Sequence, residues 1–125
     1  MTASWSAEQL DRISQSGELQ IASRRTDGTL RTSVPIWVVT VADGVYVRTW
    51  YRRTTGWFGH VIDIPKAHIR VTGLETDVIV VDVGAGAPEL RASVDISYRK
   101  KYGPSGYQSM VTDDAAAATL RLDPK

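Results

Sequence analysis

Two strand-like segments joined by Asp43-Gly44 constrain the fold more than any other feature of the sequence. The first, VPIWVVTV at 34–41, is an almost unbroken apolar run, and the second, VYVRTW at 45–50, alternates apolar with other residues. An Asp-Gly dipeptide between two such runs is a strong signal for a tight hairpin turn. We therefore predict a hairpin of Val34–Val41 and Val45–Trp50. Because its apolar run is continuous, the first strand is expected to be central and packed on both faces.

The remaining periodicities predict short strands and a few helices. Ser6 and Gln9 form a capping box pattern, with Trp5 and Leu10 at the staple positions, and predict a helix over about Ala7–Gln15. The other predicted segments are strands at 18–24, 30–33, 68–72, 77–83 and 118–122, a loop at 51–59, a helix from Pro88 to about Tyr102 and a helical turn near 108–111. This pattern indicates one mainly β (α+β) domain over residues 1–125, a small barrel of six strands with an N-terminal helix and covering helices.

Composition removes several classes of function. The 125 residues include no cysteine, so disulfides and cysteine zinc sites are excluded. The two histidines, His60 and His68, are not in a metal-binding pattern. A net charge of +1 argues against nucleic-acid binding through bulk positive charge. The first fifteen residues do not resemble a signal peptide and no apolar run could cross a membrane, so we expect a cytoplasmic protein.

Motifs for nucleophilic or acid–base catalysis are missing from the sequence. There is no G-x-S-x-G elbow and no Walker A loop. Asp95 is expected on an exposed helix face or paired with Arg99 four residues later. The cluster Arg99-Lys100-Lys101 is expected to be a solvated helix end that complements the helix dipole.

The stretch from 48 to 58 is the most informative for function. It combines the guanidinium groups of Arg48, Arg52 and Arg53 with the aromatic rings of Trp50 and Trp57. Guanidinium groups bind phosphate and carboxylate, and flat rings can cover a planar ligand. The pattern suits an anionic aromatic ligand. It also fits a solvated arginine loop whose tryptophans lie in the core, or a surface for single-stranded nucleic acid.

Several motifs, in order, resemble one known superfamily. They are R-x-D-G at 25–28, V-P-I-W-V-V at 34–39, D-G-V-Y-V-R-T at 43–49, W-F at 57–58, H-I-R-V-T-G at 68–73, D-I-S-Y-R-K-K-Y at 95–102 and A-T-L-R-L-D-P at 118–124. Taken together, they are similar to the split β-barrel of the pyridoxamine-phosphate-oxidase-like superfamily. Within it, they most resemble a branch of uncharacterised domains near the deazaflavin-dependent nitroreductase-like proteins.

This resemblance implies a homodimer with a cleft for FMN or the deazaflavin coenzyme F-420. This sequence differs from those relatives at two places. It has Gly59 where they usually carry a basic residue, and its phosphate loop offers arginines in place of lysine. The implied function is a flavin- or deazaflavin-binding oxidoreductase acting on a small molecule, with F-420 favoured slightly; the alternative is a non-enzymatic ligand-binding or interaction domain with a degenerate cleft. The residues implied for the cofactor are Arg48, Thr49, Trp50, Arg52 and Arg53 at the phosphate end, Pro35, Ile36 and Trp37 beside the ring, Trp57 closing the pocket, and Tyr98, Lys101 and Tyr102 facing the cleft.

Overall fold

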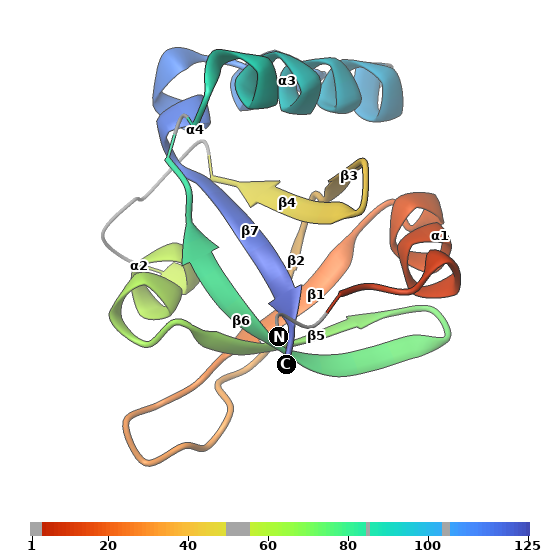
Figure 1. The fold of residues 1–125 in the computed structure, drawn as a ribbon. Coiled ribbons are helices and arrows are strands. Elements are labelled where there is room, and N and C mark those ends of the chain that lie inside the picture. Colours follow the sequence, from red (N-terminus) through yellow and green to blue (C-terminus); the bar gives the residue numbers. More distant parts are fainter. Residues whose placement is uncertain (1–3, 50–55, 85, 104–105) are drawn as a thin grey trace.

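The computed structural model describes residues 4–49, 56–84, 86–103 and 106–125 and folds them into one curled antiparallel sheet with helices around it (Figure 1). The helices are α1 (Ala7–Gln15), α2 (Gly56–Asp63), α3 (Pro88–Tyr102), the 3₁₀ helix η2 (Tyr107–Met110) and α4 (Asp113–Ala117). The strands are β1 (Leu19–Ser23), β2 (Val34–Ile36), β3 (Val39–Val41), β4 (Gly44–Arg48), β5 (Lys66–Val71), β6 (Leu74–Asp82) and β7 (Thr119–Pro124).

The two edges of the sheet curl toward each other because the two edge strands are neighbours in sequence. The strand order is β2-β1-β5-β6-β7-β4-β3, so β2 and β3 lie at opposite edges. Only Trp37 and Val38 separate these strands in the chain. Three Cα–Cα steps span at most about 11 Å, so the edges must approach each other. The result is a barrel that is open along the gap between β2 and β3, as the split-barrel expectation implied.

The prediction of one central strand over Val34–Val41 is wrong, and the sheet has seven strands where six were expected. The strand breaks at Val38 because side chains of α3 bind its backbone. The Val38 N–H donates to the Tyr102 hydroxyl at 3.1 Å, and the Val38 carbonyl accepts from Lys101 Nζ at 2.8 Å. These bonds occupy both polar backbone groups of Val38. The chain therefore leaves β2 at one edge and enters β3 at the other.

The hairpin itself is confirmed over its shorter length, with β3 paired to β4 from Val39↔Tyr46 to Val41↔Gly44. The turn lies one residue earlier than predicted, at Ala42-Asp43, and Ala42 has a φ of 52°. Gly44 begins β4. A Cβ at Gly44 would lie 2.8 Å from the Tyr46 ring, so the glycine is explained by close packing of that ring.

The capping box at the start of α1 is confirmed. Gln9 N–H donates to Ser6 Oγ at 3.1 Å, and the Ser6 N–H donates to Gln9 Oε1 at 2.8 Å. Trp5 is buried beside the core and its indole Nε1 donates to the Leu122 carbonyl at 2.9 Å. The N-terminal segment is thereby fixed to β7.

The loop predicted at 51–59 is wrong from Gly56 onward, because α2 starts there. Phe58 and Val61, three residues apart, are buried on the same side of this helix. Their burial in the core outweighs the two glycines, which disfavour a helix. Residues 51–55 lie outside the described part of the chain.

Two apolar clusters form the core. The larger one joins strands of the curled sheet with α1 and α2, and includes Ile13, Leu19, Val47 and Leu120. The smaller one lies under α3, where Val94, Tyr98 and Tyr102 recur every four residues along the helix and pack against Val39 and Tyr46. Figure 1 shows α3 crossing over the β3–β4 side of the sheet.

Candidate functional site

A pocket of about 250 Å³ lies at the gap between β2 and β3. Ile36 at the end of β2, Trp37 in the crossover and Arg48 at the end of β4 meet there. We refer to it as the aromatic pocket. The residues that line it are Glu18, Pro35, Ile36, Trp37, Arg48, Thr49, Trp57, Ser109 and Met110.

Six residues predicted for the cofactor site therefore come together, namely Pro35, Ile36, Trp37, Arg48, Thr49 and Trp57. Trp50, Arg52 and Arg53 lie outside the described residues, so their predicted roles stay predictions. Tyr98 and Lys101 do not line this pocket. Glu18, Ser109 and Met110 were missed, because nothing in their local sequence marks them as neighbours of residues far away in the chain.

Arg48 is the only charged residue among the fully buried side chains of the described chain, with none of its side chain exposed. Its Nη1 donates to Asp95 Oδ1 at 2.5 Å and to the Met110 carbonyl at 2.8 Å, and its Nε donates to Thr119 Oγ1 at 2.8 Å. Asp95 is thus paired with Arg48 and also, at 3.5 Å, with Arg91. The prediction that Asp95 would be exposed on a helix face or paired with Arg99 is therefore wrong. The ion pair ties α3 to the end of β4.

One nitrogen of this guanidinium is left over. Arg48 Nη2 is buried and has no hydrogen-bond partner among the described residues. A buried N–H without an acceptor is unfavourable by about 1–3 kcal/mol. Arg48 also belongs to the lining of the aromatic pocket, but no part of its guanidinium group is exposed there.

The aromatic wall of the pocket is built in two layers. The Trp37 ring stacks on Tyr102 with a centroid distance of 4.1 Å and an interplanar angle of 1°. The Tyr102 hydroxyl is fixed by accepting from the Val38 N–H and donating to the Gly17 carbonyl at 2.8 Å. Tyr102 therefore backs Trp37, and a planar ligand in the pocket would meet a ring that is already held in place.

Tyr98 and Lys101 lie behind this wall. Tyr98 is completely buried, its ring is 5.6 Å from the Arg48 guanidinium carbon, and burial raises the pKa of its hydroxyl. Lys101 lies over the Tyr102 ring at 5.3 Å, and burial lowers the pKa of its ammonium group to about 8. The prediction that the whole Arg99-Lys100-Lys101 cluster is a solvated helix end is therefore wrong for Lys101, which binds the Val38 carbonyl.

The described residues hold no group of three or more His, Asp or Glu side chains that could bind a metal ion. Within the same residues, no helix is long and apolar enough to cross a membrane. What the pocket offers is two tryptophan rings, a methionine, the hydroxyl-bearing residues Thr49 and Ser109, and the carboxylate of Glu18. This combination fits a planar ligand that carries a hydrogen-bond acceptor.

Several solved structures are similar to this fold. HutZ, a heme storage protein from Vibrio cholerae, has 16% sequence identity over 94% of this chain and 88% of its own, with a TM-score of 0.69. An F-420 reductase has 15% identity over 92% of this chain and 91% of its own, with a TM-score of 0.54. An FMN-binding protein related to pyridoxamine 5′-phosphate oxidase, from Nostoc punctiforme, has 12% identity over 94% and 77%, with a TM-score of 0.55.

At these identities the likeness establishes the fold alone, which is the split barrel that the ordered motifs indicated. No curated protein matches the chain in sequence. A family model described as "Uncharacterized protein conserved in bacteria (DUF2255)" matches residues 9–122. Since that match spans almost the whole sequence, the chain belongs to this family.

Proposed function

We propose that this protein is a flavin- or deazaflavin-binding oxidoreductase whose cofactor ring lies in the aromatic pocket. The observation that carries the proposal is the aromatic lining of this pocket, where the Trp37 ring is held by stacking on Tyr102 at 4.1 Å and Trp57 belongs to the same lining. An isoalloxazine or deazaflavin is a planar ring system that such side chains can cover. The ring would lie beside Trp37 and Trp57, with Pro35 and Ile36 along its edge.

The charges in the site favour binding of the cofactor's phosphate group by arginines other than Arg48. Asp95 already compensates the Arg48 charge at 2.5 Å. Arg52 and Arg53, which follow the pocket residue Thr49 closely in sequence, supply two further guanidinium groups for a phosphate. In this proposal the two later arginines bind the phosphate, while Arg48 stays in its ion pair with Asp95.

The volume of the pocket indicates how much of a cofactor it would enclose. About 250 Å³ is less than the 300–1,000 Å³ typical of pockets that bury a whole drug-sized ligand. The pocket therefore suits the ring portion of such a cofactor, with the remainder outside it. A second copy of the chain could cover that remainder, and we propose a homodimer on this basis.

When bound, a flavin or deazaflavin would supply hydride transfer chemistry. The chain's own residues would position the ring and exclude water from it. Among the described residues that line the aromatic pocket there is no histidine, and the single carboxylate is that of Glu18. F-420 is our first choice and FMN the second, because the ordered sequence motifs most resemble the deazaflavin branch.

The proposal is tested by titrating the purified protein with F-420 and with FMN while following ligand absorbance and fluorescence. We expect micromolar binding of at least one. Trp37→Leu, which removes the stacking ring but keeps an apolar side chain, should weaken binding about tenfold. Tyr107→Leu, which changes an aromatic residue of η2 outside the pocket lining, serves as the matched control and should leave affinity unchanged.

Failure of both cofactors to bind at micromolar concentration would refute the proposal and favour the alternative, a small-ligand binding domain without redox chemistry. Equal weakening by Trp37→Leu and Tyr107→Leu would show that the ring does not lie in the aromatic pocket.

A further inference from the structure

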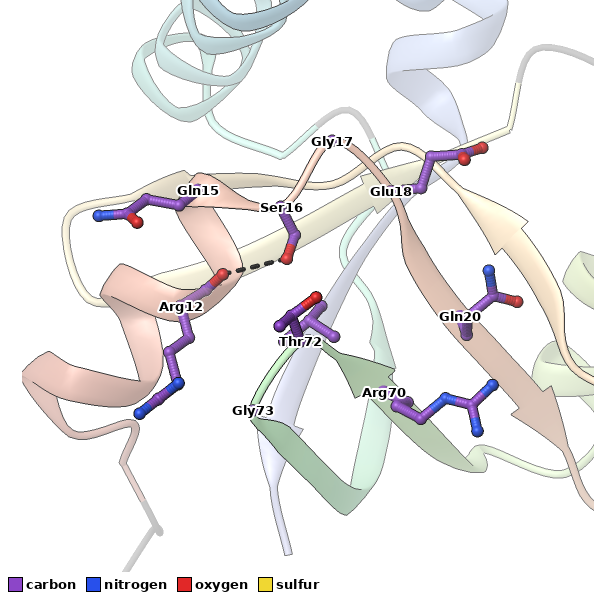
Figure 2. Close-up of a pocket in the computed structure, with 10 residues that line it drawn as sticks. Arg12, Gln15, Ser16, Gly17, Glu18, Gln20, Arg70, Thr72 and Gly73 are labelled. Carbon is purple, nitrogen blue, oxygen red and sulfur yellow. Dashed lines mark hydrogen bonds between the residues drawn. The ribbon is translucent and has the colours of Figure 1, made fainter.

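A second and larger cavity lies on the outer side of the sheet, between the end of α1, the start of β1 and the turn that joins β5 to β6 (Figure 2). This basic groove has a volume of about 950 Å³, and its lining includes Arg12, Ser16, Gln20, Arg70, Thr72 and Gly73. Among the described residues that line the basic groove, Glu18 is the only one with a carboxylate. It is also the only described residue that lines both the groove and the aromatic pocket.

Arg70 lines this groove and its guanidinium group has no ion pair among the described residues. Its neighbours in β5, Ile69 and Val71, are buried, so Arg70 lies on the opposite, outer face of the strand. Glu75 is directly across from it on β6, but the carboxylate of Glu75 binds His68 Nε2 at 2.8 Å. Arg70 has no hydrogen bond or ion pair with any other described residue.

Gln20 stands beside Arg70 as its cross-strand partner on β1. Figure 2 shows the two side chains extending in the same direction from adjacent strands. The amide of Gln20 has no hydrogen bond with another described side chain either. A guanidinium fork and an amide N–H₂ group side by side can donate together to a carboxylate or a phosphate.

Arg12 contributes a second guanidinium group, which is held in place by its contacts with Glu8 and Gly73. Its Nε and Nη2 bind Glu8 at 3.4 Å and 3.1 Å, while its Nη1 lies against Gly73 in the β5–β6 turn. A Cβ at Gly73 would overlap that nitrogen, and the φ of Gly73 is +79°. A glycine here therefore lets the arginine lie on the turn, with Nη1 unbonded among the described residues.

The end of α1 would by itself disfavour an anion, because carbonyl groups gather there. Here those carbonyls are already occupied. The Ile13 carbonyl accepts from the Ser16 N–H at 3.2 Å and lies 3.5 Å from Lys101 Nζ, and the Arg12 carbonyl accepts from Ser16 Oγ at 3.2 Å. The lining then carries the guanidinium group of Arg70 and that of Arg12, which is paired with Glu8, together with the carboxylate of Glu18.

We propose that the basic groove binds the carboxylate or phosphate group of a small molecule, with Arg70 and Gln20 as the principal donors and Arg12 as a second cation. This site is separate from the proposed cofactor pocket and does not depend on it. Since Glu18 lies on both rims, a ligand of the groove would sit next to whatever occupies the aromatic pocket.

The test is an NMR titration of the cofactor-free protein with inorganic phosphate and, separately, with succinate, at constant ionic strength set with sodium chloride. We expect saturable shifts of backbone amides at 15–20 and 70–73 with at least one of the two anions. Which anion binds more tightly distinguishes a phosphate ligand from a carboxylate ligand. Arg70→Gln should weaken binding at least about fivefold, as expected for lost charge-assisted hydrogen bonds.

Arg99→Gln is the matched control, since it removes the same charge from an exposed position of α3 outside the groove. If Arg70→Gln and Arg99→Gln weaken binding equally, the binding depends only on net charge, and the proposal is overturned. Shifts no larger than those in chloride alone would overturn it as well. Neither result bears on F-420 or FMN binding, which the cofactor titration measures separately.

Discussion

Removing the carboxylate of Asp95 should destabilise the fold markedly, because it leaves the charge of Arg48 buried without its counter-ion. Truncating one partner of a buried ion pair costs about 3–5 kcal/mol. Two features reduce this figure. The Asp95 side chain is 28% exposed, and the Arg48 guanidinium keeps the Met110 carbonyl and Thr119 Oγ1 as acceptors. We therefore expect Asp95→Ala to lower the free energy of unfolding by about 2–3 kcal/mol.

Urea unfolding at 25 °C, followed by tryptophan fluorescence, measures this change. With an m-value of about 1–3 kcal/mol/M for a small protein, the urea midpoint should fall by about 0.7–3 M. Glu89→Ala, which removes an exposed carboxylate from the first turn of the same helix, should cost less than about 1 kcal/mol. The double variant Arg48→Met/Asp95→Ala should be more stable than the two single effects summed, because it leaves no unpaired charge. If Asp95→Ala and Glu89→Ala destabilise equally, Asp95 does not anchor Arg48.

Three further predictions concern other residues. Hydrogen bonding to Asp77, and then to Glu75, raises the pKa of His68. The stabilisation of the fold by protonated His68 is therefore complete below about pH 6.5 and is lost as the pH rises through the folded-state pKa. Urea unfolding should show that His68→Asn is less stable than the native protein by about 1 kcal/mol near pH 5.5 and equally stable by pH 9, and a difference that does not change with pH would contradict this. Tyr98→Phe removes a buried hydroxyl without a partner among the described residues and should leave the thermal midpoint unchanged or raise it, with stability altered by up to about +1 kcal/mol; a clear loss would reveal a bond to that hydroxyl. Arg52→Ala with Arg53→Ala should weaken cofactor binding by about 1–3 kcal/mol in the absorbance titration, whereas Arg99→Ala should not, and unchanged affinity would place the phosphate elsewhere.

The local signals in the sequence predicted local structure well. The capping box of Ser6 and Gln9, the β3–β4 hairpin and the helix from Pro88 to Tyr102 all depend on residues close together in the chain, and each is confirmed. The split at Val38 could not be predicted in this way. It depends on Tyr102 and Lys101, more than sixty residues later, and an apolar run alone does not distinguish one buried strand from two edge strands.

The candidate site shows the same division. The resemblance predicted that Trp37, Arg48 and Trp57 belong to one site, and in the structure all three line the aromatic pocket. It did not indicate that Arg48 is paired with Asp95, since the register of α3 against β4 sets that contact. The basic groove was missed entirely, because Arg12, Gln20 and Arg70 look like ordinary exposed residues until the fold brings them to the lining of one groove.

The central claim is that the aromatic pocket holds the ring of a flavin or deazaflavin. Its most direct test is a fluorescence titration of the native protein and of Trp37→Leu with F-420 and with FMN. Our account predicts micromolar binding of at least one cofactor to the native protein and a roughly tenfold loss in the variant. An absence of micromolar binding by both cofactors, or equal affinity in the two proteins, would contradict it.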